Sequence, residues 1–468
     1  MNTAGDNNST ATPTAATQPR FTRWCRSVMS PYFFIAAIAA VIGALCGAAA
    51  FAFKWLLAEI SGIFIPLVKG DGINWWIIAI PTAGIILTGL FNRYIIHDNP
   101  SNGTGRIIND LNNGNYRLRG DLVYSPIVAS SITLGMGGTS GSEGPIAYAG
   151  AAIGSNMGKL FRLDDDTLRT LIGCGTSAGI AGIFLAPVGG IMFGLEVIRI
   201  KLNTTGVLAV TIACLMSFFV IAILKGLAPD MTFIPSVRAE HLNFIPMVLL
   251  GVFCGIYSLY YSCVVRHMDS VFTNIKNPLA RNITGGVAIG MCLLCFPSMF
   301  GVGYPVIQDV INGHPESIAS GSIVSTLVPG DMLLIISCVG LMMLKCWGVS
   351  ATNSSGGVGG DFAPTLFAGC MAGFLFAALC NNWLSIDIPA GVFAFLGMAG
   401  VMSGAIEAPL MTIFIVTEMT HSFDFAVPII IVATVSYVTV MIGKRLANIQ
   451  GRMVRHITWF LKNEKLKM

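Results

Sequence analysis

The chain has 468 residues, of which 54% are hydrophobic and 11% carry a charge. Because soluble domains carry roughly 25% charged residues, this composition excludes a soluble domain and indicates a polytopic membrane protein. The formal net charge of +4 is small, and no patch of the kind that binds nucleic acid interrupts the sequence.

In chain order, the first segment is a polar stretch without an apolar core. We expect residues 1–29 to form a disordered cytoplasmic tail and not a cleaved signal peptide. Between 121–200, and again between 351–420, glycine and proline cut the apolar sequence into segments that we predict are too short to span alone. Such broken helices survive at membrane depth only where protein covers them or where they line a wet cavity. Stretches that can cross a bilayer at about 20 residues each lie near 32–53, 74–91, 204–225, 244–265, 282–302, 331–347 and 425–443.

Basic residues lie at both ends of the apolar region. Arg20, Arg23 and Arg26 precede the first span, and several lysines and arginines follow the last one. By the positive-inside tendency both termini are cytoplasmic, which requires an even number of crossings. We therefore expect a multi-pass protein of the inner (cytoplasmic) membrane, with residues 446–468 forming a basic tail at its cytoplasmic surface.

An internal repeat is the strongest organisational signal. The pairs that match at one offset are Ala186-Pro187 with Ala408-Pro409, Gly175 with Gly397, Gly182 with Gly404, and Glu196 with Glu418. Coincidences at one offset and in one order indicate a duplication, with halves of about 30–225 and 243–445 inside a transmembrane domain at 30–445. In secondary transporters such halves are commonly inverted across the membrane, and the substrate lies where their broken helices meet. The sequence reveals the duplication but not the inversion.

Three glycine-rich breaks lie at Gly103–Gly105, Gly141–Pro145 and Gly356–Pro364. Each one exposes the unpaired N–H groups of a following helix start, which carry partial positive charge. Helix dipoles can hold a small anion at low dielectric without retaining it as firmly as a lysine would. The loops carry no lysine or arginine except Arg106, so the pattern predicts an anion site. Glu143, in the second break, is an acid at membrane depth and therefore a candidate functional residue.

Other polar residues have simpler interpretations. We expect Glu196 and Glu418, late in their helices, to meet a helix end or the membrane boundary. Asp164 followed by Thr167 predicts a solvated helix start. The 12 cysteines lack metal-ligand spacing and indicate free, buried thiols. No catalytic triad, metal site or nucleotide site emerges, so we expect neither enzymatic activity nor a cofactor.

The three loops, their order and the duplicated Ala-Pro helices resemble the CLC family of chloride channels and chloride/proton antiporters, over about residues 30–445. The resemblance implies an all-α polytopic membrane protein, with a CLC-type inverted repeat of tilted and broken helices. It implies a homodimer with one anion pathway per subunit. The partners would be chloride or another small anion, protons and the lipid bilayer.

The resemblance also assigns roles to individual positions. Glu143 matches the family's gating glutamate, whose carboxylate occupies an anion site when ionised and swings out when protonated. Phe362 matches a phenylalanine at which the N–H groups of Asp361 and Phe362 would face a central anion, and Thr104 matches a serine that donates to that anion. The implied gating and proton-coupling residue is Glu143, and the implied substrate-binding positions are Thr104, Gly105, Gly144, Pro145, Ile146, Asp361 and Phe362.

The chain departs from the family pattern at several positions. The first loop lacks the family's proline, and Arg106 follows it. Ser142 stands where a basic residue is frequent in the family. Asp361 stands where an apolar residue is common. Two other departures bear on mechanism. Val197 occupies the place of the exchangers' inner proton glutamate, and residues 447–448 are Ala and Asn where a tyrosine closes the inner side of the anion site.

We therefore expect chloride/proton antiport through Glu143, slow or loosely coupled, because the gating acid is retained and the inner acid is missing. Glu196, one position from Val197, would point about 100° away around the helix, and water could carry the proton instead. A passive chloride channel of the same fold is an alternative that Val197 favours. A carrier of an organic solute is disfavoured by the cation-poor loops, and fluoride export is disfavoured by the ordinary Gly-x-Phe-x-Pro loop.

Overall fold

The computed structural model describes residues 30–68, 75–97, 103–200, 203–225, 233, 237–328, 332–384 and 386–464. The tail expected at 1–29 lies outside these residues. Within the described ranges the regular elements are helices, and the β-type pairing consists of a single bridge between Gly141 and Gly360.

The two halves of the chain contribute similar sets of helices. The first half contains α2 (Pro31–Val68), α3 (Trp76–Phe91), the π-helical η2 (Asn92–Ile96), α4 (Gly103–Asn112), η3 (Gly120–Val123), α5 (Ser125–Gly135), α6 (Glu143–Leu160), α7 (Asp165–Phe184), α8 (Pro187–Glu196) and α9 (Thr204–Lys225). The second half contains η4 (Ala239–His241), α10 (Phe244–Thr273), α11 (Pro278–Cys295), η5 (Pro297–Met299), α12 (Tyr304–Ile311), η6 (Pro315–Ile318), α13 (Ile323–Leu327), α14 (Met332–Ser354), α15 (Phe362–Trp383), α16 (Ala390–Ile406), α17 (Pro409–Thr420), η7 (Phe423–Phe425) and α18 (Ala426–Glu464).

Among the described residues, eight helices are long and apolar enough to cross a membrane. They include a helix in every predicted span, although α11 ends at Cys295 because Pro297 follows and restricts the residue before it. The prediction of only short segments in 351–420 was wrong for α15, a continuous helix of 22 residues. Short apolar helices are present as expected in α5, α16 and α17.

The backbone conformation shows the same repeat as the sequence. Leu185 and Glu407, one residue before the two Ala-Pro pairs, both adopt the left-handed conformation, with φ of 55° and 61°. Ala186 follows with φ −124° and ψ 81°, and Ala408 with φ −130° and ψ 76°. Non-glycine residues rarely adopt positive φ, so the same rare turn at equivalent positions confirms the duplication.

Glycines at equivalent positions allow pairs of helices to cross at backbone contact. A Cβ at Gly175 of α7 would overlap the carbonyl of Gly150 in α6, and a Cβ at Gly397 of α16 would overlap the carbonyl of Gly369 in α15. Close crossing through small residues is the usual way that helices associate in a membrane. These glycines therefore pack helices together instead of breaking them, which is why α15 is longer than expected.

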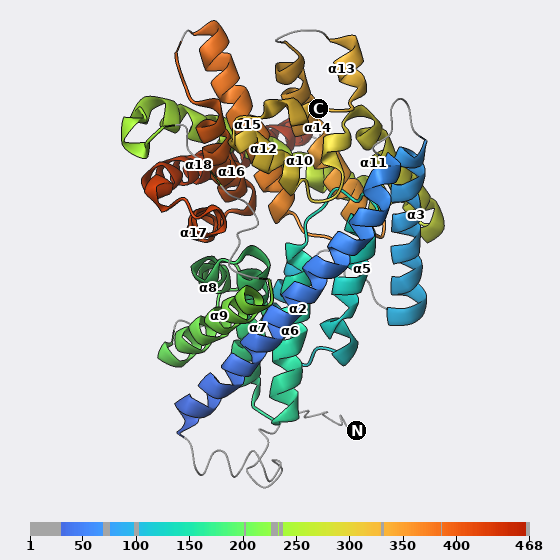
Figure 1. Ribbon diagram of the computed structural model, residues 1–468, viewed down its shortest axis with the longest axis vertical. Coiled ribbons are helices and arrows are strands. Elements are labelled where there is room, and N and C mark those ends of the chain that lie inside the picture. The colour runs from blue at the N-terminus through green and yellow to red at the C-terminus, as the bar shows by residue number, and fades with distance from the viewer. Residues whose placement is uncertain are drawn as a thin grey trace.

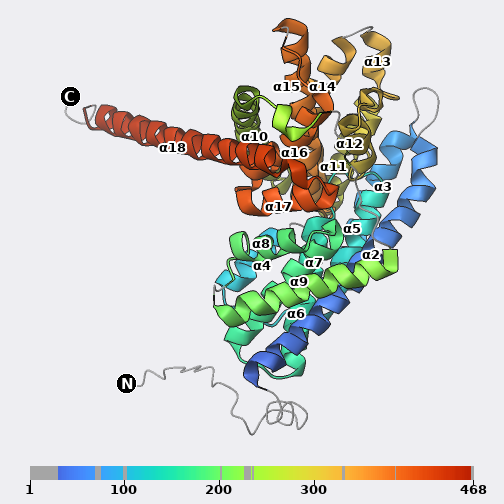
Figure 2. The ribbon, with the colours of Figure 1, turned by 60° about the vertical axis from the view of Figure 1, so that its left-hand side comes forward.

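The halves lie one above the other in the view of Figure 1, with α8 and α17 facing each other where they meet. α3 of the first half also packs against α11 of the second. The last helix, α18, leaves the body as one long helix (Figure 2) and runs through residue 445, where the sequence analysis places the end of the transmembrane domain.

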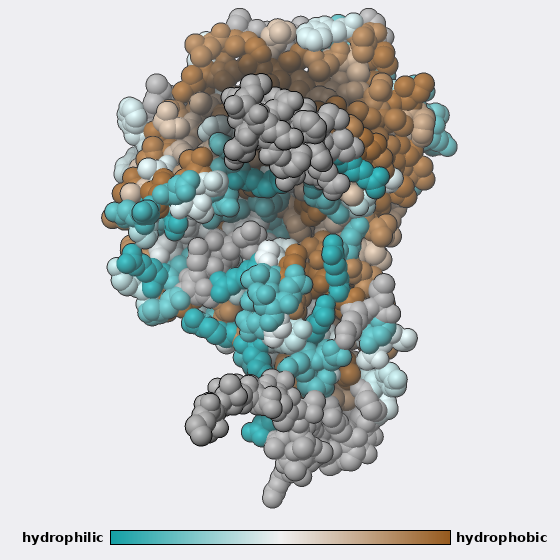
Figure 3. Space-filling view, turned by 180° about the vertical axis from the view of Figure 1, so that it is seen from behind, coloured by the Kyte–Doolittle hydropathy of each residue, from teal (hydrophilic) through white to brown (hydrophobic). Residues whose placement is uncertain are grey.

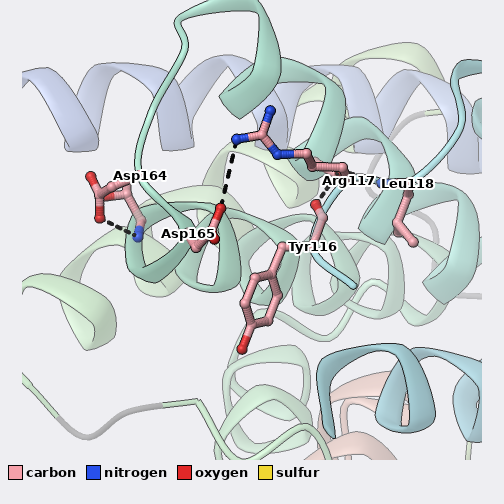
Figure 4. A network of polar contacts seen from close by, with 7 residues as sticks. Tyr116, Arg117, Leu118, Asp164 and Asp165 are labelled. Carbon is pink, nitrogen blue, oxygen red and sulfur yellow. Dashed lines mark hydrogen bonds and ion pairs between the residues drawn. The ribbon is translucent and has the colours of Figure 1, made fainter. Parts of the chain in front are cut away.

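Hydrophilic and apolar residues are segregated on the surface. On the face shown in Figure 3, hydrophilic residues gather over the middle, and apolar residues cover the upper part. Figure 4 shows one polar turn, in which Asp165 lies 3.8 Å from Arg117. Asp164 caps α7 by accepting hydrogen bonds from the backbone N–H of Thr167 at 3.1 Å and from its hydroxyl at 2.8 Å, which confirms the predicted helix start.

Candidate anion-binding site

The three glycine-rich breaks meet at one place in the interior. Gly141 and Gly360, from opposite halves, exchange backbone hydrogen bonds of 2.8 and 2.7 Å. A Cβ at Gly144 would lie 3.3 Å from the carbonyl oxygen of Gly359, and a Cβ at Gly103 would overlap the carbonyl oxygen of Gly144. At Gly103 any side chain would push the loops apart, and at Gly144 the neighbouring backbone would have to shift by a few tenths of an ångström.

Glu143 lies at the centre of this junction and is fully buried. Its Oε1 accepts a hydrogen bond of 3.2 Å from the backbone N–H of Ala363, in the first turn of α15. The Tyr304 hydroxyl donates to the same oxygen over a long 3.4 Å. Oε2 has no hydrogen-bond partner in the described part of the chain. An acid from the first half thus caps a helix of the second half, at the position that favours negative charge.

Lys345 is a second buried charge that the sequence analysis passed over. Its ammonium is fully buried in α14 and has no hydrogen-bond partner among the described residues. It lies 4.7 Å from the ring centroid of Phe367, within cation–π range, and that ring packs against Gly303, the neighbour of Tyr304. A lysine inside the stretch predicted to span at 331–347 was the available signal, since charges in such segments are rare and usually functional.

The predicted binding positions in the second half begin α15. Asp361 precedes the helix, and its Oδ1 accepts a hydrogen bond of 3.1 Å from the Asn353 side chain. Phe362 is buried, and its ring meets that of Phe193 edge to face at 5.7 Å between centroids. The N–H that binds the Glu143 carboxylate belongs to Ala363, one residue beyond the two N–H groups that the sequence analysis named.

The predicted binding positions in the first half differ in how deeply they are buried. Thr104 is half-buried in the first turn of α4, next to the exposed Gly105. Gly144 lies at the junction of the loops, and Pro145 and Ile146 are buried behind it. A Cβ at Gly179 would lie 2.8 Å from the Ile146 carbonyl oxygen, so Ile146 lies at the contact with α7.

Glu196 and Glu418 act as reciprocal helix caps between the halves. Glu418 accepts from the backbone N–H groups of Val188 at 3.1 Å and Gly189 at 2.7 Å, at the start of α8. Glu196 accepts from the N–H groups of residues 410 and 411, at 3.4 and 2.8 Å, at the start of α17. The expectation of a helix-end partner is confirmed. These hydrogen bonds hold the Glu196 carboxylate at the start of α17.

The end of α18 differs from the family pattern. The helix continues past Ala447 without a break, so no new helix N-terminus forms at the point where a tyrosine would close the anion site. Near this point Lys444 pairs with Glu407, the left-handed residue that precedes Ala408. The side chain of Asn448 lies outside the described residues.

A family model described as "Voltage gated chloride channel" matches residues 83–441, which includes all three loops and both Ala-Pro turns. The chain belongs to this family. Within the CLC family it is 28% identical over 426 residues to the H(+)/Cl(-) exchange transporter ClcA of Vibrio campbellii, a match that covers 85% of this chain and 84% of the relative.

Two solved CLC structures have the same fold. A slow cyanobacterial Cl⁻/H⁺ antiporter superposes with a TM-score of 0.72 at 21% identity, covering 88% of this chain and 95% of that one. A CLC-type fluoride/proton antiporter superposes with a TM-score of 0.65 at 23% identity, covering 86% of this chain and 94% of that one. These likenesses establish the CLC-type inverted repeat of tilted and broken helices.

Proposed function

We propose that the chain is a chloride/proton antiporter that couples the two ions through Glu143. The observation that carries this proposal is the hydrogen bond of 3.2 Å from the Ala363 N–H to the Glu143 carboxylate, at the start of α15. Such a helix start is an anion site, and here a side chain that can lose its charge occupies it. The 28% identity to an H(+)/Cl(-) exchange transporter supports the choice of ions.

Exchange follows from competition for this site. When Glu143 is ionised, its carboxylate takes the Ala363 N–H and excludes chloride. When Glu143 takes up a proton, its negative charge is removed, the carboxyl group leaves, and chloride replaces it. The proton must be released before the carboxylate can return, so the chloride and the proton exchange places. Thr104, Gly105, Gly144, Pro145, Ile146, Asp361 and Phe362 are the positions that we propose to surround the anion.

Lys345 makes the site suitable for a dehydrated anion. A buried ammonium without a hydrogen-bond partner among the described residues is costly. When Glu143 leaves, an incoming chloride restores the balance of charge. Phe367 covers the ammonium on one side, and the role proposed for Lys345 is electrostatic attraction of the anion.

We also propose that both termini are cytoplasmic in the inner membrane and that two copies form a homodimer. α9 and α17, which both contact α8, carry large exposed apolar side chains that a second copy would cover. These are Leu208, Leu215, Phe219, Leu410 and Phe414. Mass measurement in nanodiscs tests the dimer, and a single-subunit mass would contradict it.

The reversal potential under crossed chloride and pH gradients tests the exchange directly. In reconstituted vesicles a chloride gradient should drive protons uphill, and the voltage that stops both fluxes gives the stoichiometry, because each unit charge is worth about 2.3 kcal/mol per 100 mV. If protons stay at equilibrium while chloride drains at the rate of a channel, the protein is a passive CLC channel. The absence of an acid at Val197 favours that alternative.

A further inference from the structure

A cavity of about 440 Å³ lies where η2, at the end of α3, meets the start of α11. Three basic side chains line it, those of Arg93, His97 and Arg281, and no acid is among the described residues of its wall. Neither arginine forms an ion pair with a described residue. Because positive charges that converge without a counter-ion repel one another, the cavity favours an anion.

The backbone at the end of α3 brings two of these basic side chains to the cavity. η2 is a π-helix, in which the N–H of His97 donates to the carbonyl oxygen of Asn92, five residues earlier. His97 then ends the helix in the left-handed conformation, with φ of 56°. The wide turn places Asn92, Arg93 and His97 along one wall. Such π-helical turns are rare and occur frequently at functional sites.

Asn92 gives a second, independent indication of a ligand. Its side chain is 5% exposed, and both polar atoms of its amide lack a hydrogen-bond partner in the described part of the chain. Nε of Arg281 also lacks one there. Buried polar groups without partners are costly, and both residues line the cavity. A ligand that carries acceptor oxygens would satisfy these donors.

The opposite wall is built around Asn282, in the first turns of α11. A Cβ at Gly89 of α3 would overlap the Asn282 amide, and a Cβ at Gly356 would lie 2.8 Å from its Oδ1. Gly356 has φ of 114°, a conformation that favours glycine. Three segments that are distant in the sequence therefore form one cavity. Since Gly356 begins the third glycine-rich break, an occupant would contact the loop that leads to α15.

The surroundings of the cavity favour a lipid as the source of the anion. With the N-terminus in the cytoplasm, as proposed, α2 crosses outward and α3 returns, so η2 lies at the cytoplasmic end. A second, apolar cavity of about 510 Å³ borders the same turns and is lined by side chains that include Leu90, Tyr94 and Ile95. Basic pockets between transmembrane helices on the cytoplasmic side bind acidic head groups, and an apolar neighbour suits an acyl chain.

We propose that the cavity between η2 and α11 binds a phosphate group, carried by an acidic phospholipid of the cytoplasmic leaflet or by a soluble phosphate compound. The planar guanidinium groups of Arg93 and Arg281 match the geometry of phosphate oxygens, and Asn92 supplies a further donor. The volume lies in the range of small-molecule sites, roughly 300–1,000 Å³. The proposal does not depend on the proposed antiport.

The experiment measures binding to the purified full chain in detergent, at one fixed chloride concentration. Native mass spectrometry with phosphatidylglycerol, against phosphatidylcholine with the same acyl chains, tests the lipid, and calorimetry with sodium phosphate tests the soluble source. Combining Arg93→Gln with Arg281→Gln should weaken binding of the ligand at least tenfold, because both charges that face it are gone. The Tm of this double variant without ligand should match that of wild type.

The matched control combines Arg266→Gln with Lys276→Gln. Both residues are exposed, near the end of α10 and before α11, and neither lines the cavity. This variant loses the same charge and should bind as tightly as wild type.

Binding of phosphatidylglycerol alone assigns the site to a lipid, and binding of sodium phosphate alone assigns it to a soluble compound. If neither binds, or if both double variants lose affinity equally, the proposed site is wrong. Should the variant of Arg93 and Arg281 not fold, Asn92→Ala decides the question: it keeps both charges, removes one donor, and should weaken binding at least threefold.

Discussion

The two halves of the protein share a scaffold but place their acids differently. Both contain a left-handed residue before an Ala-Pro pair, and both cross two helices at facing glycines. In the first half the acid at the loop, Glu143, is fully buried and begins α6. In the second half Asp361 is only partly buried and precedes α15. The features that both halves share determine where helix ends meet. The acids, which differ between the halves, determine the chemistry of the site.

This difference gives the two acids different partners. The helix start of the second half binds the carboxylate of the first. Its own acid, Asp361, accepts a hydrogen bond from Asn353, which adjoins the Ser354 that donates to Asp269. If both acids were buried at the junction, two like charges would compete for the same N–H groups. One buried and one partly buried acid avoid this competition.

Glu143→Gln should have the largest effect, because it removes the acid that only the first half places at the junction. We expect uphill proton transport to fall at least a hundredfold while chloride flux persists, since glutamine cannot exchange a proton. Chloride-driven proton uptake in vesicles measures both. Proton coupling that survives in Glu143→Gln would show that the two acids are interchangeable and would remove the basis of the comparison.

Gly175→Ala and Gly397→Ala test the shared scaffold. Each added Cβ would overlap a backbone carbonyl, which cannot move as a side chain can, so each variant should lose about 1–3 kcal/mol of stability. Thermal unfolding in detergent measures the loss. Gly62→Ala is the control, because nothing lies within 4 Å of its Cβ, and its Tm should not fall. A loss in only one half would mean that the crossings are not equivalent.

Lys345→Met tests the cation on the second-half side of the site. In a Glu143→Gln background, chloride affinity measured by calorimetry should weaken about tenfold, or about 1.4 kcal/mol, because the buried charge that attracts the anion is gone. Lys345→Arg should retain the affinity. Equal affinity in the methionine and lysine proteins would assign Lys345 to packing alone.

Glu196→Gln and Glu418→Gln should have the smallest effects, and these should be similar. Each acid accepts two backbone N–H groups from the opposite half, and loss of a helix cap costs about 0.5–2 kcal/mol. The Tm should fall in both while the proton-to-chloride ratio stays constant. A change of that ratio in Glu196→Gln alone would make Glu196 a transport residue.

The sequence predicted the repeat, the three breaks and the buried acid because each leaves a local mark. The sequence alone reveals an Ala-Pro pair, a glycine run or a carboxylate in an apolar stretch, because none of them depends on what the residue contacts in the fold. It mispredicted α15 because a glycine that packs against another helix looks the same as a glycine that ends one. It passed over Lys345 because a lone lysine near the end of a span resembles a boundary residue.

Composition and pattern by themselves determined that the chain is a duplicated membrane protein with an acid among broken helices. Only the tertiary structure decided that Ala363 and Tyr304 bind this acid and that Glu196 serves a helix of the other half. The physical reason is distance along the chain. Local propensity and hydrophobicity depend on neighbouring residues. Each of these contacts instead joins residues more than a hundred positions apart, and such residues come together only when the chain packs in three dimensions.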